Sequence, residues 1–128
     1  MRGDTMSGSY NILFVDDDQD SCEMMSVLLM LGNSDFEVIS AHTAEEALAL
    51  IKAQSFDLFI LDYLLPDMTG LDLCDRIRQI DKQTPIMFYS AMTHIIDKET
   101  AKAAGANEFL VKPNDLDRLS ETVEHYLY

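Results

Sequence analysis

The sequence predicts an α/β fold: a doubly wound (βα)5 arrangement in which helices cover both faces of a five-stranded parallel sheet. Two observations predict this fold class. Short apolar runs alternate five times with amphipathic stretches, and the segments that join them are short. Most of the runs, such as "LFIL" and "IMF", are apolar throughout, as is typical of parallel strands that crossover helices bury on both faces. The predicted strands cover residues 10–15, 36–41, 56–62, 85–91 and 108–111.

Each predicted strand is followed by a stretch in which apolar residues recur at helical spacing. Gly32 ends the first of these stretches and Gly105 closes the fourth, as glycines commonly do after a helix. Thr43 and Thr69 each stand three positions before an acidic residue, which is the spacing of a capping box at a helix N-terminus. The predicted helices cover residues 19–32, 43–54, 69–80, 94–106 and 114–128.

The length and composition indicate one domain. A chain of 128 residues, of which 48% are hydrophobic, is long enough to bury a core of its own. No apolar run approaches the about 20 residues of a membrane-spanning helix, and the first ten residues lack the apolar segment of a secretory signal. We therefore expect residues 1–9 to be a disordered leader or a remnant of an expression vector, and residues 10–128 to form the domain. The expected location is cytoplasmic, with no membrane partner.

The sulfur-containing residues predict core packing rather than metal or redox chemistry. Cys22 and Cys74 fall in predicted helices without the paired spacing of a metal site, as expected of small core residues in a reducing compartment. Met24, Met25 and Met30 belong to the first predicted helix, and flexible thioether side chains commonly fill gaps in a core. We therefore expect these methionines in the core.

The charge balance argues against one class of partner. With 23 acidic and 9 basic residues the net charge is −14, whereas direct nucleic-acid binding requires a basic surface. Clustered carboxylates can instead form a cation site. Asp18 and Asp20 are expected to be first-turn charges that the helix dipole favours. His42, His94 and His125 have no metal-ligand spacing, and no role is assigned to them.

Polar residues stand at the ends of four predicted strands. Asp16 and Asp17 follow the first strand, Asp62 ends the third, Ser90 lies at the end of the fourth and Lys112 follows the fifth. In a doubly wound sheet the ligand binds beyond the carboxyl ends of the strands, where the strand order reverses. We therefore expect these five residues to form one site.

The chemistry of this residue set points to phosphoryl transfer. Three converging carboxylates repel one another unless a cation lies among them, and Mg2+ prefers such hard oxygen ligands. An aspartate beside Mg2+ can act as a nucleophile toward a phosphoryl group and become an aspartyl-phosphate. The lysine ammonium and the serine hydroxyl can then stabilise the charge of the transferred group. On this interpretation Asp62 is the nucleophile.

The ordered motifs "FVDDD", "LDYLLPDMTG", "YSA" and "FLVKP" resemble the response-regulator receiver domain of two-component signalling, over residues 10–128. The resemblance implies a flavodoxin-like fold. It implies that Asp16, Asp17, Asp62 and the backbone carbonyl of Leu64 hold Mg2+. It also implies that Asp62 is the phosphoacceptor and that Lys112 pairs with the phosphoryl group.

The same resemblance assigns switch residues and shows departures. Ser90 matches the switch hydroxyl, and Phe109 stands where many members have a switch tyrosine, so its ring can pack but has no hydroxyl. The Lys112–Pro113 bond resembles a cis peptide of the family, since only X-Pro bonds adopt the cis form readily. Leu64 and Met92 are large and apolar where polar residues often stand. Their bulk predicts a slow in-line attack of water and a long-lived phosphorylated form.

These expectations favour a regulatory domain rather than an enzyme. Asp62 would accept a phosphoryl group from a phosphohistidine of a histidine kinase or a histidine phosphotransfer protein, and so change a partner-binding surface. The output partner or output domain is unknown, and a phosphorylation-dependent dimer is one outcome. Two alternatives stay open: a receiver-like binding module that works without phosphorylation, and an aspartate-dependent phosphatase. Against the phosphatase, such an enzyme needs a second acid two residues after its nucleophile, where this chain has Leu64, and 128 residues leave no room for a substrate cap.

Overall fold

The computed structural model describes residues 9–91 and 98–128, and within them it has the predicted architecture. All strand pairs are parallel, in the order β2-β1-β3-β4-β5. The strands are β1 (Tyr10–Val15), β2 (Phe36–Ala41), β3 (Leu58–Leu61), β4 (Ile86–Ser90) and β5 (Glu108–Val111). The helices are α1 (Gln19–Gly32), α2 (Ala44–Ala53), α3 (Gly70–Ile80), α4 (Lys98–Ala104) and α5 (Leu116–Leu127).

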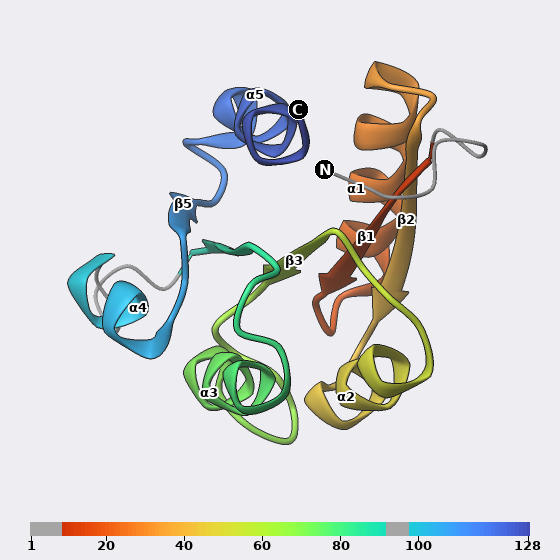
Figure 1. Ribbon diagram of the computed structural model, residues 1–128. Coiled ribbons are helices and arrows are strands. Elements are labelled where there is room, and N and C mark those ends of the chain that lie inside the picture. Colours follow the sequence, from red (N-terminus) through yellow and green to blue (C-terminus); the bar gives the residue numbers. More distant parts are fainter. Residues whose placement is uncertain (1–8, 92–97) are drawn as a thin grey trace.

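The helices form a layer on each side of the sheet. Figure 1 shows α1 and α5 on one face and α2, α3 and α4 on the other. Successive strand side chains point to opposite faces, so each strand contributes to two cores. In β1, for example, Leu13 and Val15 belong to the core under α2, α3 and α4, whereas Ile12 and Phe14 belong to the core under α1 and α5. Full burial of one such side chain stabilises the fold by about 1.5–3 kcal/mol.

The predicted elements agree with the structure except at their ends. β3 begins at Leu58, two residues later than predicted, although Phe56 is buried in the core. The first part of the predicted fourth helix, residues 94–97, lies outside the described residues, as do residues 1–8 of the predicted leader. Among the described residues, no helix is both long enough and apolar enough to cross a membrane.

The prediction for the sulfur-containing residues is confirmed for three of five. Cys22, Cys74 and Met25 are buried, and the two cysteines are free thiols. Met24 and Met30 are 49% and 43% exposed, so their assignment to the core was wrong. The reason is the helical repeat: Met25 shares its face of α1 with the buried residues three or four positions away, whereas Met24 and Met30 point away from the sheet.

Candidate functional site

The pairing of β1 with β3 brings two of the predicted carboxylates together. Val15 and Leu61 are register partners, and each is followed by an aspartate. The backbone N–H of Asp62 donates to the carbonyl of Val15 over 3.0 Å, so the residue that ends β3 is held against the end of β1. Because the strand order reverses at β1, with β2 on one side and β3 on the other, Asp16 and Asp62 lie at the switch point of the sheet.

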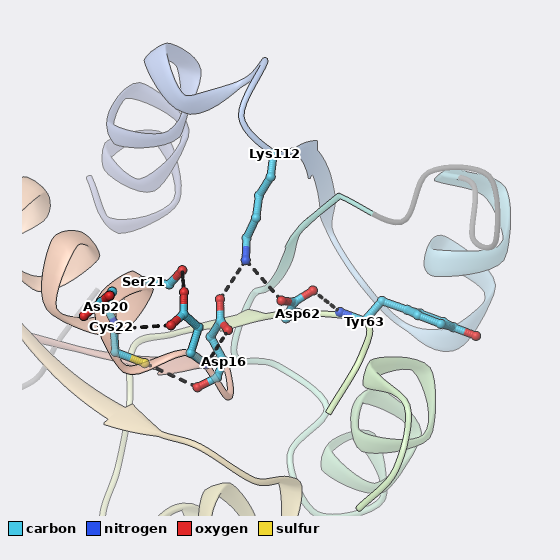
Figure 2. Close-up of polar contacts among 8 residues, drawn as sticks. Asp16, Asp20, Ser21, Cys22, Asp62, Tyr63 and Lys112 are labelled. Atoms are coloured by element: carbon cyan, nitrogen blue, oxygen red, sulfur yellow. Dashed lines mark hydrogen bonds and ion pairs between the residues drawn. The ribbon is translucent and has the colours of Figure 1, made fainter. Parts of the chain in front are cut away.

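Lys112 joins these two carboxylates. It follows β5, and its backbone N–H donates to the carbonyl of Ser90 at the end of β4 over 3.0 Å. From there its ammonium reaches back across β4: Nζ lies 2.7 Å from Asp16 Oδ2 and 3.1 Å from Asp62 Oδ2 (Figure 2). The Lys112–Pro113 peptide bond is cis, as the resemblance implied.

The three charges are largely removed from water. The exposed fractions of the Asp16, Asp62 and Lys112 side chains are 2%, 15% and 21%. Burial by itself lowers the pKa of Lys112, but its hydrogen bond to Asp16 and the nearby charge of Asp62 outweigh burial and raise that pKa above its usual value. Lys112 is therefore an ammonium at neutral pH, shared between two carboxylates.

Each carboxylate also accepts a backbone N–H with its second oxygen. Asp16 Oδ1 accepts from Asp18 N at 3.0 Å, and Asp62 Oδ1 accepts from Tyr63 N at 2.7 Å. The side chain of Asp18 is the N-cap of α1 and accepts from Asp20 N, so Asp18 precedes the first turn in which it was predicted, whereas Asp20 lies in that turn as predicted. The carboxylates are thus fixed in orientation by the strand ends and the loops that follow them.

The donor atoms suit a hard cation, but the side chains alone do not form a complete metal site. Asp16 and Asp62 both present a carboxylate oxygen to the Lys112 ammonium. Carboxylate oxygens are the donor type that Mg2+ prefers. Asp17 is exposed. Within residues 9–91 and 98–128, no three His, Cys, Asp or Glu side chains are grouped closely enough to hold a metal. The structure therefore unites two of the three predicted carboxylates, and a metal here would also need Asp17, backbone carbonyls or water.

The two predicted switch residues lie on neighbouring strands. Ser90 is fully buried at the end of β4 and is the register partner of Val111. Phe109, which is 5% exposed, stacks on Phe88 with ring centroids 6.0 Å apart and an interplanar angle of 27°. The ring of Phe109 is thus part of the core under α2, α3 and α4. Met92 lies outside the described residues, and Leu64 is 51% exposed.

Sequence reasoning missed the packing role of Gly70. The N–H of Gly70 donates to the carbonyl of Tyr63 and closes the loop between β3 and α3. A Cβ at this position would lie 2.2 Å from the Asp62 carbonyl oxygen and 2.8 Å from Phe88 Cε1. Only glycine lets α3 begin this close to the end of β3, and the "DMTG" pattern by itself does not reveal that contact.

The comparisons with known proteins agree with this fold and residue set. The chain matches the family "Response regulator receiver domain" over residues 12–124. It is 40% identical over 111 residues to the response regulator protein PilR of Pseudomonas aeruginosa, covering 87% of this chain and 24% of PilR. It is 38% identical over 106 residues to the regulatory protein VanR of Enterococcus faecium, covering 82% of this chain and 44% of VanR.

A solved structure shows that the similarity extends to the three-dimensional fold. The response regulator protein TrrA of Thermotoga maritima, solved in complex with Mg2+-BeF, superposes with a TM-score of 0.82 at 31% identity, covering 91% of this chain and 98% of that one. The family match and this structural likeness place the chain among the regulatory domains of response regulators. The chain belongs to the response regulator receiver family. It spans less than half the length of PilR and VanR.

Proposed function

We propose that this domain is a phosphorylation switch in which Asp62 accepts a phosphoryl group, with Mg2+, from a phosphohistidine of a histidine kinase or a histidine phosphotransfer protein. The observation that carries the proposal is the shared contact of Lys112 Nζ with Asp16 Oδ2 and Asp62 Oδ2, at 2.7 and 3.1 Å. A cation that already touches the acceptor oxygen is in place to pair with a phosphoryl group on that oxygen.

The transfer requires an in-line displacement at phosphorus. An oxygen of the Asp62 carboxylate attacks, the P–N bond to the donor imidazole breaks, and its electron pair stays on the nitrogen. Lys112 Nζ moves from the carboxylate to a phosphoryl oxygen, and the Ser90 hydroxyl donates to another. Mg2+, held by Asp16, Asp17, Asp62 and the Leu64 carbonyl, would supply the further positive charge that the phosphoryl oxygens need.

An exposed apolar face of α1 supports the proposed donor. Met24, Val27 and Leu31 are 49%, 57% and 83% exposed. With Leu28 they line a shallow groove, whose lining also includes the acidic residues Asp20 and Glu23. α1 begins three residues after Asp16, so this face starts beside the site. We propose that the donor docks its own apolar helix here, with basic residues toward Asp20 and Glu23.

The proposal is tested by labelling with a small phosphodonor. Incubation with acetyl phosphate and Mg2+ should add one phosphoryl group per chain, measured by intact-mass spectrometry and mapped to Asp62. Asp62→Asn should remove the label and keep the fold, while the control Asp75→Asn, an exposed acid on α3, should keep both. Undiminished label on Asp62→Asn would reject the assignment. Multiple turnover of external phosphoesters would favour the phosphatase alternative.

The metal is tested by its effect on stability. A ligand that binds only the folded protein stabilises it by mass action, so millimolar Mg2+ should raise the melting temperature. Asp17→Ala should blunt that rise, because the proposed site needs a carboxylate beyond the pair that Lys112 neutralises. An equal response of the wild type and Asp17→Ala would show that Asp17 is not a ligand.

A further inference from the structure

The loop between β3 and α3 is attached to the N-terminus of α2, the helix that follows β2. At the tip of this loop, the carboxylate of Asp67 reaches the N-terminus of α2. Its Oδ1 accepts from Ala44 N and its Oδ2 from Glu45 N, both at 2.9 Å. These partners lie 23 and 22 residues earlier in the chain, so the contact joins two segments that the chain does not connect directly.

Asp67 completes the N-terminus of α2. The helix has a cap of its own, since Thr43 Oγ1 accepts from Glu46 N at 3.0 Å. Together Thr43 and Asp67 occupy the first three free N–H groups of the helix. Burial would raise the pKa of Asp67, but the N–H donors outweigh it and lower that pKa below its usual value. The side chain is therefore an anion in a position where the helix dipole favours one.

The same loop begins at the proposed phosphoacceptor. Its base is closed by the hydrogen bond from Gly70 N to the Tyr63 carbonyl and by an antiparallel bridge between Leu64 and Thr69. Tyr63 N donates to Asp62 Oδ1 at 2.7 Å, so the first peptide of the loop orients the acceptor carboxylate. The base of the loop is thus fixed to β3 and α3, and the hydrogen bonds of Asp67 fix its tip to α2.

We propose that Asp67 is a positioning residue for phosphoryl transfer: by tying the loop tip to α2, it holds the Leu64 carbonyl and the Tyr63 N–H in the orientation that the metal and the Asp62 carboxylate require. The inference rests on the proposed function, because the reaction it serves is the phosphorylation of Asp62. A site whose ligands come from a loop gains affinity when the loop is held in its binding conformation beforehand.

The test compares Asp67→Ala with Thr43→Ala. Both variants remove side-chain bonds to the N-terminus of α2, but only Asp67→Ala releases the loop. Loss of such a bond changes an equilibrium by about fivefold. We therefore expect Asp67→Ala to weaken Mg2+ binding, measured from the Mg2+-dependent rise in melting temperature, by about that factor and to slow labelling by acetyl phosphate at limiting Mg2+. Thr43→Ala should lower the melting temperature in EDTA yet keep the wild-type Mg2+ affinity.

A second readout does not involve phosphorylation or metal. In EDTA, the Tyr63 amide should exchange its hydrogen several-fold faster in Asp67→Ala than in the wild type, and at the wild-type rate in Thr43→Ala. The inference is overturned if Asp67→Ala and Thr43→Ala bind Mg2+ with equal affinity, or if the Tyr63 amide of Asp67→Ala exchanges at the wild-type rate. Labelling of the wild type would still uphold the proposed function in either case. If the wild type takes no label at all, the proposed function fails first and this inference falls with it.

Discussion

Replacement of Lys112 by methionine should destabilise the metal-free protein strongly. The change keeps most of the length of the side chain but removes the cation from two carboxylates, one of which has only 2% of its side chain exposed. Removing one partner of a buried ion pair costs about 3–5 kcal/mol. The Lys112 and Asp62 side chains are still 21% and 15% exposed, so water screens part of their interaction. We therefore expect the free energy of unfolding to fall by about 2–3 kcal/mol, at or below the lower end of that range. In a domain of this size that corresponds to a fall of about 10 °C in melting temperature.

Two further measurements separate charge from packing. Most of the loss should come from the carboxylate left without a partner, so Asp16→Asn should restore part of the stability when it is combined with Lys112→Met. Mg2+ should raise the melting temperature of Lys112→Met by more than that of the wild type, because metal then replaces a missing cation rather than competing with one.

The assay is thermal unfolding followed by circular dichroism, in EDTA and in millimolar Mg2+. Lys82→Met is the matched control, since Lys82 is exposed and lies in the loop before β4, away from the site. If Lys112→Met and Lys82→Met unfold at the same temperature in EDTA, the ion pairs contribute nothing to stability. If Asp16→Asn adds its own loss to that of Lys112→Met, the two residues are not coupled.

Four other predictions follow from the same geometry. The pKa of Lys112 is raised by folding, so its contribution is fully present below the ordinary lysine pKa of 10.5 and is lost as the pH rises above it. In urea unfolding, the wild type should lose free energy of unfolding as the pH rises from about 9 to 11.5, and Lys112→Met should lose less. The loss that remains in the variant reflects other groups such as Tyr89, whose pKa is raised by burial. Leu31→Asp should slow transfer from a phosphohistidine donor and leave acetyl phosphate labelling unchanged; equal slowing with both donors would count against the docking face. Phe109→Ala should cost about 3–5 kcal/mol in urea unfolding and weaken phosphorylation-dependent partner binding, whereas Phe109→Tyr should be tolerated; unaltered partner binding in the alanine variant would remove Phe109 from the switch. Leu64→Asn should shorten the half-life of the phosphorylated form, and a half-life equal to that of the wild type would reject the steric account.

The fold was predictable because its signal is repeated along the chain. Alternation of apolar runs and helical periods occurs five times, and each occurrence supports the others. One error arises where a residue is buried without belonging to a helix or strand. Phe56 is buried but precedes β3, because the chain there makes a different contact: the carboxylate of Asp57 accepts from Asn11 N. An apolar residue can cover the core from a loop, and the sequence does not distinguish this from a strand.

The orientation of α1 was only partly predictable. Between residues 24 and 31 its sequence is "MMSVLLML", in which almost every position is apolar, so the pattern does not select one face. The structure turns Met25 and Leu29 inward and leaves Val27 and Leu31 exposed. The excess of apolar residues is therefore at the surface, where it forms the proposed docking face.

The site was predictable where the strand-end rule applies and not elsewhere. That rule found Asp16, Asp62 and Lys112 because each directly follows a strand. It does not predict the contacts of Gly70 and Asp67, which depend on distances between segments: the approach of α3 to the end of β3, and the contact of a loop tip with α2. No periodicity or spacing encodes such contacts.

Under the proposed function, we expect Lys112 to connect the phosphorylation of Asp62 to the sheet. Without a phosphoryl group, one ammonium serves Asp16 and Asp62 together. A phosphoryl group on Asp62 replaces one negative charge by about two, at a greater distance from the backbone. We expect Lys112 to follow that charge, and its backbone N–H is bonded to the carbonyl of Ser90, whose hydroxyl is expected to turn the same way. Phe109 lies in β5, three residues before Lys112, which directly follows that strand. The ring of Phe109 packs on Phe88. We therefore expect a shift at the end of β5 to be accommodated by the Phe88–Phe109 pair, which lies in the closely packed core under α2, α3 and α4. In such a core a small displacement at the site would then change the helical surface.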